Sequence, residues 1–278
     1  MILKEEILVQ ADEHNLFPTT IEKDYVLSWV LWGIFLHPLL SSKLVFKGGT
    51  CLKKCFFGSY RFSEDLDFTL TKPTTLIELE KSFQEVCEWV QENSRIMFFQ
   101  KKQKFEEYKT PRGNLAFQGR LRYQGPLKHK TSFPKIKLDI TAHEILVEKP
   151  SLCKVLHHYS DSCKEEVQIA TYSFEEVFAE KIRALIQRSR PRDLYDVIHL
   201  NNQQIHAYNK ALVRDILLKK CNFAKVPYPE IEKLLNRQNK EFVATGWSNM
   251  LAHQISGLEP VEHYWKQLPE VFSWIQQV

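Results

Sequence analysis

The chain has 278 residues, of which 44% are hydrophobic and 26% are charged, and its formal net charge is +4. This length and apolar content allow one large domain or two modest ones with a packed core, and they argue against a disordered chain. Six cysteines occur without a Cys-x-x-Cys pair, so the sequence predicts neither a structural zinc site nor a disulfide framework.

The N-terminal region predicts a protein without a membrane anchor. Its most apolar stretch, residues 26–40, is interrupted by Gly33 and Pro38 and is too short to cross a bilayer. The first dozen residues are rich in charge and lack the long apolar run of a secretory signal. We therefore expect a cytoplasmic location and no membrane partner.

Periodicity predicts a helix, a strand and a second helix in the first 57 residues. Apolar residues recur at helical spacing over residues 20–36, after a segment with capping-box spacing. Residues 44–46 form a short apolar run that ends at Lys47-Gly48-Gly49, which is typical of a buried strand whose exit requires little side-chain bulk. A helix is expected from Thr50 to Phe57.

The following segments predict two strands that each carry a carboxylate on their polar face. Residues 66–70 alternate apolar and polar side chains, with Asp65 at the strand entrance and Asp67 on the polar face. A helix over residues 76–90 and strand-like pieces near 97–99 and 115–123 come next. Residues 136–140 alternate again, which places Lys137 and Asp139 on one face.

The remainder of the chain is predicted to be mostly helical. A capping box begins at Ser173, and further helices are expected to begin near residues 192, 208, 229 and 260. The change in pattern places a boundary near Thr171, which separates an α/β half, residues 1–170, from a helical half, residues 171–278.

Three aspartates form the candidate metal site. Asp65-x-Asp67 supplies two carboxylates on one side of a strand, and Asp139 adds a third if its strand is adjacent. Magnesium or manganese held by such oxygen ligands would neutralise phosphate charge during phosphoryl or nucleotidyl transfer. Taken alone, an Asp-x-Asp pair also fits a solvated strand end.

The diglycine turn is the candidate nucleotide-binding element. Gly48 and Gly49 precede the helix expected at Thr50, so backbone N–H groups and the helix N-terminus could approach a triphosphate closely. Most Gly-Gly pairs are merely turns. Lys47 beside them suits either a phosphate contact or a solvated strand edge.

The positive charge is concentrated between residues 101 and 137. This stretch holds eleven Lys or Arg residues against two Glu residues, among them Arg120, Arg122, Lys128 and Lys130. Such a basic surface is the footprint of a polyanionic partner such as RNA or DNA, while a solvated hairpin is an equally good explanation.

Several segments together resemble the AbiEii/AbiGii-type nucleotidyltransferase toxin family of abortive-infection and toxin–antitoxin systems. The segments are residues 45–54 (VFKGGTCLKK), 61–68 (RFSEDLDF), 21–25 (IEKDY), 180–185 (EKIRAL) and 188–196 (RSRPRDLYD). They span residues 20–200 in similar order. The family often has Ser where Cys51 stands, and its second downstream acid stands one residue further from the first than Asp196 does from Asp193.

The resemblance implies an α+β fold with a polymerase-β-like nucleotidyltransferase core, a mixed sheet flanked by helices, followed by a mostly helical half that completes the nucleotide cleft. It implies that Gly48, Gly49 and Thr50, with Asp65 and Asp67, grip a metal-bound NTP. It also implies transfer of a nucleotide to an acceptor, RNA and in particular the 3′ end of tRNA, and an antitoxin of the AbiEi type.

The resemblance extends the catalytic set to Lys181, Asp193 and Asp196. The family's motif has a nucleotide-contacting lysine at the position of Lys181, which could otherwise be a lysine whose stem covers apolar surface. Asp193 could instead complement a helix macrodipole in the first turn.

Two residues before the Asp-x-Asp pair complete the candidate nucleotide site. Arg61 suits a phosphate contact or a pair with Glu64, and Ser63 suits a residue that positions the loop.

Three functions fit these features. The first is an RNA-directed nucleotidyltransferase toxin, the second is a nucleotidyltransferase that acts on a protein or small molecule, and the third is an inactive nucleic-acid-binding or partner-binding module. Against the third, a binding module has no reason to gather three carboxylates that repel one another without a metal ion.

Overall fold

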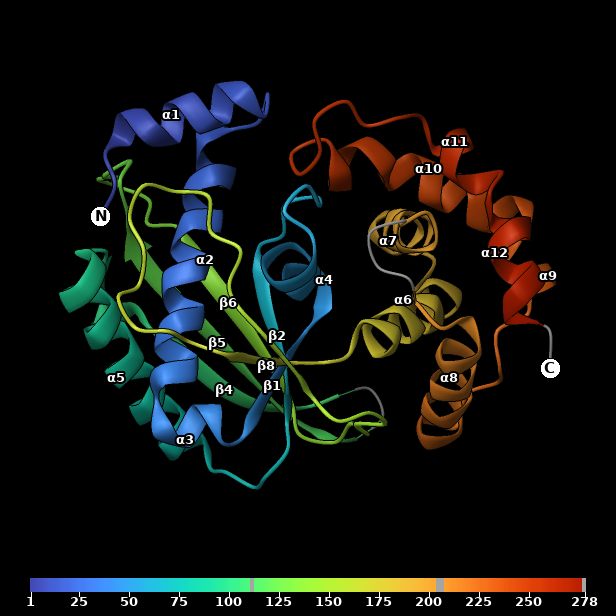
Figure 1. Ribbon diagram of the computed structural model, residues 1–278, viewed down its shortest axis with the longest axis horizontal. Coiled ribbons are helices and arrows are strands. Elements are labelled where there is room, and N and C mark those ends of the chain that lie inside the picture. Colours follow the sequence, from blue (N-terminus) through green and yellow to red (C-terminus); the bar gives the residue numbers. More distant parts are fainter. Residues whose placement is uncertain (111–112, 204–207, 277–278) are drawn as a thin grey trace. The chain divides into compact units, whose positions relative to one another are not determined.

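The computed structural model describes residues 1–110, 113–203 and 208–276, which divide into two compact units (Figure 1). Unit 1 comprises Met1–Glu144 and Pro150–Tyr172, and unit 2 comprises Ile145–Lys149 and Ser173–Val278. Residues 145–149 belong to unit 2, although in the sequence they come before the last strands of unit 1. The functional domains drawn at residues 1–170 and 171–278 stay a prediction.

Unit 1 is built on a mixed eight-stranded sheet in the order β3-β5-β6-β2-β1-β8-β7, with β4 also paired to β5. The central strand β2 runs antiparallel to β1 and parallel to β6. The strands are β1 (Leu44–Lys47), β2 (Asp65–Leu70), β3 (Met97–Phe98), β4 (Lys104–Lys109), β5 (Leu115–Gln124), β6 (Lys135–Thr141), β7 (Ser151–Cys153) and β8 (Ile169–Thr171).

Helices of unit 1 cover the apolar face of the sheet. Figure 1 shows α2 and α5 side by side against it. Phe35 of α2 packs on Phe68 of β2 and Phe83 of α5 stacks on Phe105 of β4, with ring centroids 6.4 and 5.5 Å apart. The helices are α1 (Lys4–Glu13), α2 (Pro18–Leu36), α3 (Pro38–Ser41), α4 (Gly48–Cys51), the π-helix η1 (Leu52–Phe56), α5 (Leu76–Ser94) and the 3₁₀ helix η2 (Gln100–Lys102).

Unit 2 is helical in its described residues. Lys220 of α8 lies 2.9 Å from Glu176 and 3.0 Å from Glu180 of α6, so a buried charge cluster joins these helices. Its helices are α6 (Phe174–Arg188), α7 (Pro191–Asn201), α8 (Lys210–Ala224), α9 (Ile231–Leu234), α10 (Arg237–Leu251), α11 (Val261–Trp265) and α12 (Leu268–Ile275).

The expected strands and long helices are present, and the α+β class is confirmed. The helix expected from Thr50 begins instead at Gly48 and continues as the π-helix η1. Sequence periodicity missed α1, α3, β4, β7 and β8, and no helix start was expected at α10 or α12. Among the described residues, no helix combines the length and apolar character needed to span a bilayer.

Candidate active site

Four polar side chains stand in one row across the middle of the sheet. Asp67 on β2 pairs in register with Lys47 on β1 and with Asp139 on β6, and Asp139 pairs with Gln118 on β5. Paired residues on neighbouring strands project to the same face. The structure therefore brings Asp67 and Asp139 together although they are 72 residues apart in the sequence.

Asp65 stands one row further along the same face. It pairs in register with Lys137, whose Nζ lies 4.0 Å from Oδ1 of Asp65. Burial raises the pKa of Asp65, Lys137 lowers it, and the charges of Glu64 and Asp139 raise it, with the net effect upward. Burial is thus the largest cause of the raised pKa of Asp65, and the neighbouring carboxylates add to it.

The diglycine turn packs directly against this row. Gly48 has φ +85°, and a Cβ at this position would clash with Oδ2 of Asp67. A Cβ on Gly49 would lie 2.7 Å from Nη2 of Arg61 and 3.2 Å from Oγ of Ser63. Only residues without a side chain allow these approaches, so the turn, Asp67, Arg61 and Ser63 form one cluster.

Thr50 and Arg61 are both buried beside the turn. The Thr50 hydroxyl donates a hydrogen bond to the backbone carbonyl of Asp65, and the Arg61 guanidinium donates one to the carbonyl of Phe62. Glu64, the alternative partner considered for Arg61, accepts a hydrogen bond from Lys23 at 3.1 Å. In this structure the Thr50 hydroxyl therefore holds the entrance of β2 against the turn.

Lys47 is a buried cation at the edge of the row. Its Nζ lies 3.6 Å from Oε2 of Glu144 and 5.6 Å from the centre of the Tyr172 ring. The solvated strand edge considered for this residue is therefore excluded, because its side chain is only 10% exposed. The role of Lys47 as a phosphate contact stays a prediction.

The remaining candidate catalytic residues lie in unit 2, in two ion pairs. Lys181 of α6 contacts the buried Asp196 of α7 at 2.7 Å. Arg188 donates to both carboxylate oxygens of Asp193, at 2.6 and 2.7 Å. Asp193 and Asp196 thus have different partners, and their roles in catalysis stay a prediction.

The four basic residues proposed for nucleic-acid binding are at two places. Arg120 and Arg122 lie on β5, and Arg120 donates to Glu106 and Gln118, each at 3.2 Å. Lys128 and Lys130 lie in the exposed loop between β5 and β6, roughly 20 Å along the strand from the carboxylate row. The structure brings only the arginines near the row.

Sequence reasoning missed two sets of residues around the site. Lys137 was placed on the face of Asp139, but its pairing with Asp65 and Arg120 needs the strand register. Asp24 and Lys54 form a buried pair beneath the diglycine turn, and only their presence in the IEKDY and GGTCLKK segments could have pointed to them.

Asp65, Asp67 and Asp139 are the candidate ligands of a divalent cation. Within residues 1–110, 113–203 and 208–276, no three His, Cys, Asp or Glu side chains stand close enough together to form a ready metal site. The chemistry of Asp65, Asp67 and Asp139 nevertheless fits a divalent cation, because all three offer carboxylate oxygens. Their role as metal ligands stays a prediction.

The mixed sheet with its flanking helices thus carries the paired aspartates beside a diglycine turn, and its class follows from the family match. The chain belongs to the AbiEii toxin family of nucleotidyltransferases from type IV toxin–antitoxin systems, which its sequence matches over residues 29–276. It is therefore a nucleotidyltransferase of a family that acts with an antitoxin partner.

Solved structures share this fold. The nucleotidyltransferase toxin MenT4 from Mycobacterium tuberculosis is 20% identical, with a TM-score of 0.57 over 99% of this chain and 98% of that one. A candidate nucleotidyltransferase from H. pylori is 18% identical, with a TM-score of 0.58 over 94% of this chain and 96% of that one. A comparison with curated proteins gives no significant match.

Proposed function

We propose that the protein is a metal-dependent toxin that transfers a nucleoside monophosphate from an NTP to the 3′ end of an RNA, tRNA in particular. The register pairing of Asp67 with Asp139, next to the Gly48 turn, carries this proposal. Two carboxylates on adjacent strands, with Asp65 two residues away, are the oxygen donors that Mg²⁺ or Mn²⁺ requires. The expected antitoxin is of the AbiEi type.

Each group of residues has a separate task in this reaction. A bound divalent cation would neutralise phosphate charge and align the acceptor hydroxyl with the phosphate under attack. Gly48 and Gly49 leave space for phosphate oxygens, and Lys47 and Arg61 supply fixed positive charge beside that space. We assign the nucleotide-contacting role in unit 2 to Lys181, which Asp196 holds in one orientation.

Labelled NTPs test the proposal. The wild type is incubated with each of the four NTPs, Mg²⁺ and total RNA, beside Asp67→Asn and Asp139→Asn. We expect labelled RNA from the wild type only, with all proteins equally folded by circular dichroism. Full labelling by either variant would remove that carboxylate from the mechanism.

The same experiment separates the other acceptors. Label that enters protein or a small molecule, with RNA unlabelled, would assign the chain to the second class of nucleotidyltransferase. Expression in cells adds an independent measurement, since a toxic wild type and a harmless Asp67→Asn variant would tie growth arrest to the transfer reaction.

A further inference from the structure

A row of cations lies beside the carboxylates on the polar face of the sheet. Lys137 on β6 pairs in register with Arg120 on β5, and Arg120 pairs with Lys104 on β4. The same row continues to Asp65 on β2. Because register partners project to one face, these three cations share the face of the candidate metal ligands.

A second row lies two residues further along the strands, where Arg122 on β5 pairs with Lys135 on β6. The first row remains accessible, since Lys104 and Lys137 are 60% and 51% exposed. Glu106 contacts both Lys104 and Arg120, at 3.0 and 3.2 Å. The pair with the exposed Lys104 is weak, so a phosphate group can replace the carboxylate at that lysine.

Two aromatic rings follow the second row. The rings of Phe99 and Phe133 have centroids 4.1 Å apart, and Nζ of Lys102 lies 5.4 and 4.5 Å from the two ring centres. Arg122 joins this cluster to the cations, because its guanidinium donates to the carbonyl of Phe133 and its own carbonyl accepts from the N–H of Phe99.

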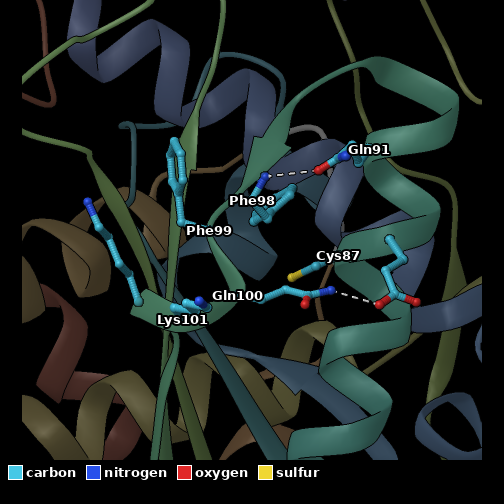
Figure 2. Close-up of a pocket in the computed structure, with 8 residues that line it drawn as sticks. Cys87, Gln91, Phe98, Phe99, Gln100 and Lys101 are labelled. Atoms are coloured by element: carbon cyan, nitrogen blue, oxygen red, sulfur yellow. Dashed lines mark hydrogen bonds between the residues drawn. The ribbon is translucent and has the colours of Figure 1, made fainter.

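Figure 2 shows on which side of the sheet edge these residues lie. Gln100 reaches toward α5, where it donates to Glu88 at 2.8 Å, and the N–H of Phe98 donates to Gln91 of α5. Phe98 pairs in register with the buried Tyr123 of β5 and so lies on the apolar face, and the next residue, Phe99, lies opposite to it. Because α5 covers the apolar face, Phe99 is directed to the polar face that carries the cation rows.

The carboxylates, the cations and the aromatic rings therefore follow one another in a fixed order along the chain that leads into β6. Asp139, Lys137, Lys135 and Phe133 are each two residues apart in the sequence, so an extended chain spaces them by about 6.6 Å and covers about 20 Å in total. Carboxylates come first, then two rows of cations, then an aromatic pair. Cations that follow a phosphate backbone and aromatic rings that stack on bases are the components of single-strand binding sites.

We propose that this face binds the acceptor as a single-stranded nucleic acid, with its reactive end at the carboxylates, its phosphates over the two cation rows and one base stacked at Phe99 and Phe133. The inference rests on the proposed function and specifies its acceptor. A duplex suits the face less well, because its bases are already stacked on one another and unavailable to the rings.

Salt-dependent binding tests the cation rows. Anisotropy of a labelled single-stranded RNA 12-mer is measured between low and moderate salt for the wild type, for Lys104→Gln/Lys137→Gln and for the control Lys81→Gln/Lys154→Gln. The control lysines are at least as exposed, at 79% and 67%, and lie one on α5 and one beyond β7 at the opposite edge of the sheet. Losing two phosphate contacts should reduce the slope of log K against log salt by about 1.4 in the first variant only.

The aromatic pair is tested with the rings replaced by another apolar side chain. Phe99→Leu/Phe133→Leu should weaken single-strand binding by about tenfold and leave blunt-duplex binding unchanged. Phe17→Leu, at an exposed position of the same unit, should change neither. Duplex RNA or an acidic peptide that binds as tightly as the single strand would overturn the inference.

Transfer kinetics separate this inference from the proposed function. Both double variants should raise KM for the RNA acceptor, and Phe99→Leu/Phe133→Leu, which does not touch the partner of Asp65, should keep kcat. If the wild type labels RNA and these variants label it with unchanged KM, the inferred single-strand binding site is wrong and the proposed function stands. If the wild type labels no RNA, the proposed acceptor is wrong, and the inferred single-strand binding site is rejected with it.

Discussion

Nζ of Lys54 lies 2.5 Å from Oδ2 of Asp24, and the two side chains are only 1% and 6% exposed. Lys54 belongs to the π-helix that follows the diglycine turn, and Asp24 belongs to α2. The hydroxyl of Tyr159 also donates to Asp24, at 2.9 Å. This ion pair therefore links η1, which follows the diglycine turn, to α2.

Breaking this pair should destabilise the protein strongly. Burial raises the pKa of Asp24, but the charges of Lys54 and Lys53 with the hydrogen bonds outweigh it and lower the pKa. Asp24→Ala leaves Lys54 buried without its partner, so we expect a loss of about 3–5 kcal/mol in unfolding free energy, measured with urea. Lys23→Ala, which removes a more exposed pair, should cost less than about 1 kcal/mol.

A double-mutant cycle checks the same point. Asp24→Leu/Lys54→Met removes both charges and should recover most of the lost stability. Additive losses in the double variant would show that the two residues stabilise the fold independently.

Gly48→Ala should abolish transfer because its Cβ displaces Asp67. The strain of φ +85° alone costs on the order of 1–2 kcal/mol. Gly257→Ala is the matched control, since Gly257 has φ +64° and no atom within 4 Å of the added Cβ. Gly257→Ala should show the loss of stability from the backbone strain alone in thermal unfolding, Gly48→Ala should lose at least as much, and only Gly48→Ala should lose labelling of the acceptor.

The two acids of α7 should differ in their effects on kinetics. Asp196→Asn removes the charge that orients Lys181, and we expect kcat to fall by about 100-fold. Asp193→Asn weakens the bond to Arg188 and should cost about 1–3 kcal/mol of stability with kcat retained. Steady-state kinetics and urea unfolding on both variants distinguish the roles, and equal losses of kcat would contradict the assignment.

The pH dependence of stability should reveal Lys53. Burial lowers its pKa to about 8, with Asp24 raising it and Lys54 lowering it. Between pH 8 and its usual value of about 10.4, the unfolded chain holds a proton that the folded protein lacks, so stability rises with pH in that window. Relative to Lys53→Met, the wild type should gain stability from pH 8 to 10 and show a constant difference below pH 7. A flat difference throughout would mean that the pKa is not lowered.

Strand prediction succeeded where alternation was strong and failed where it was weak. β2 and β6 bury alternate apolar residues and were therefore recognisable. β4 has the sequence KFEEYK, and of its side chains only the partly buried Phe105 packs against the hydrophobic core, because β4 is an edge strand largely in contact with solvent. β7 and β8 have three residues each, too few for any period to show.

The sequence by itself determined which faces of the strands carry carboxylates, because side-chain alternation is a local property with a period of two. It also determined the glycine turn and the family. Only the tertiary structure decided that β6 lies parallel to β2 with Asp139 opposite Asp67, that Asp24 meets Lys54, and that Lys181 meets Asp196. Strand order and register depend on how apolar faces pack between segments remote in sequence, and no local pattern contains that information.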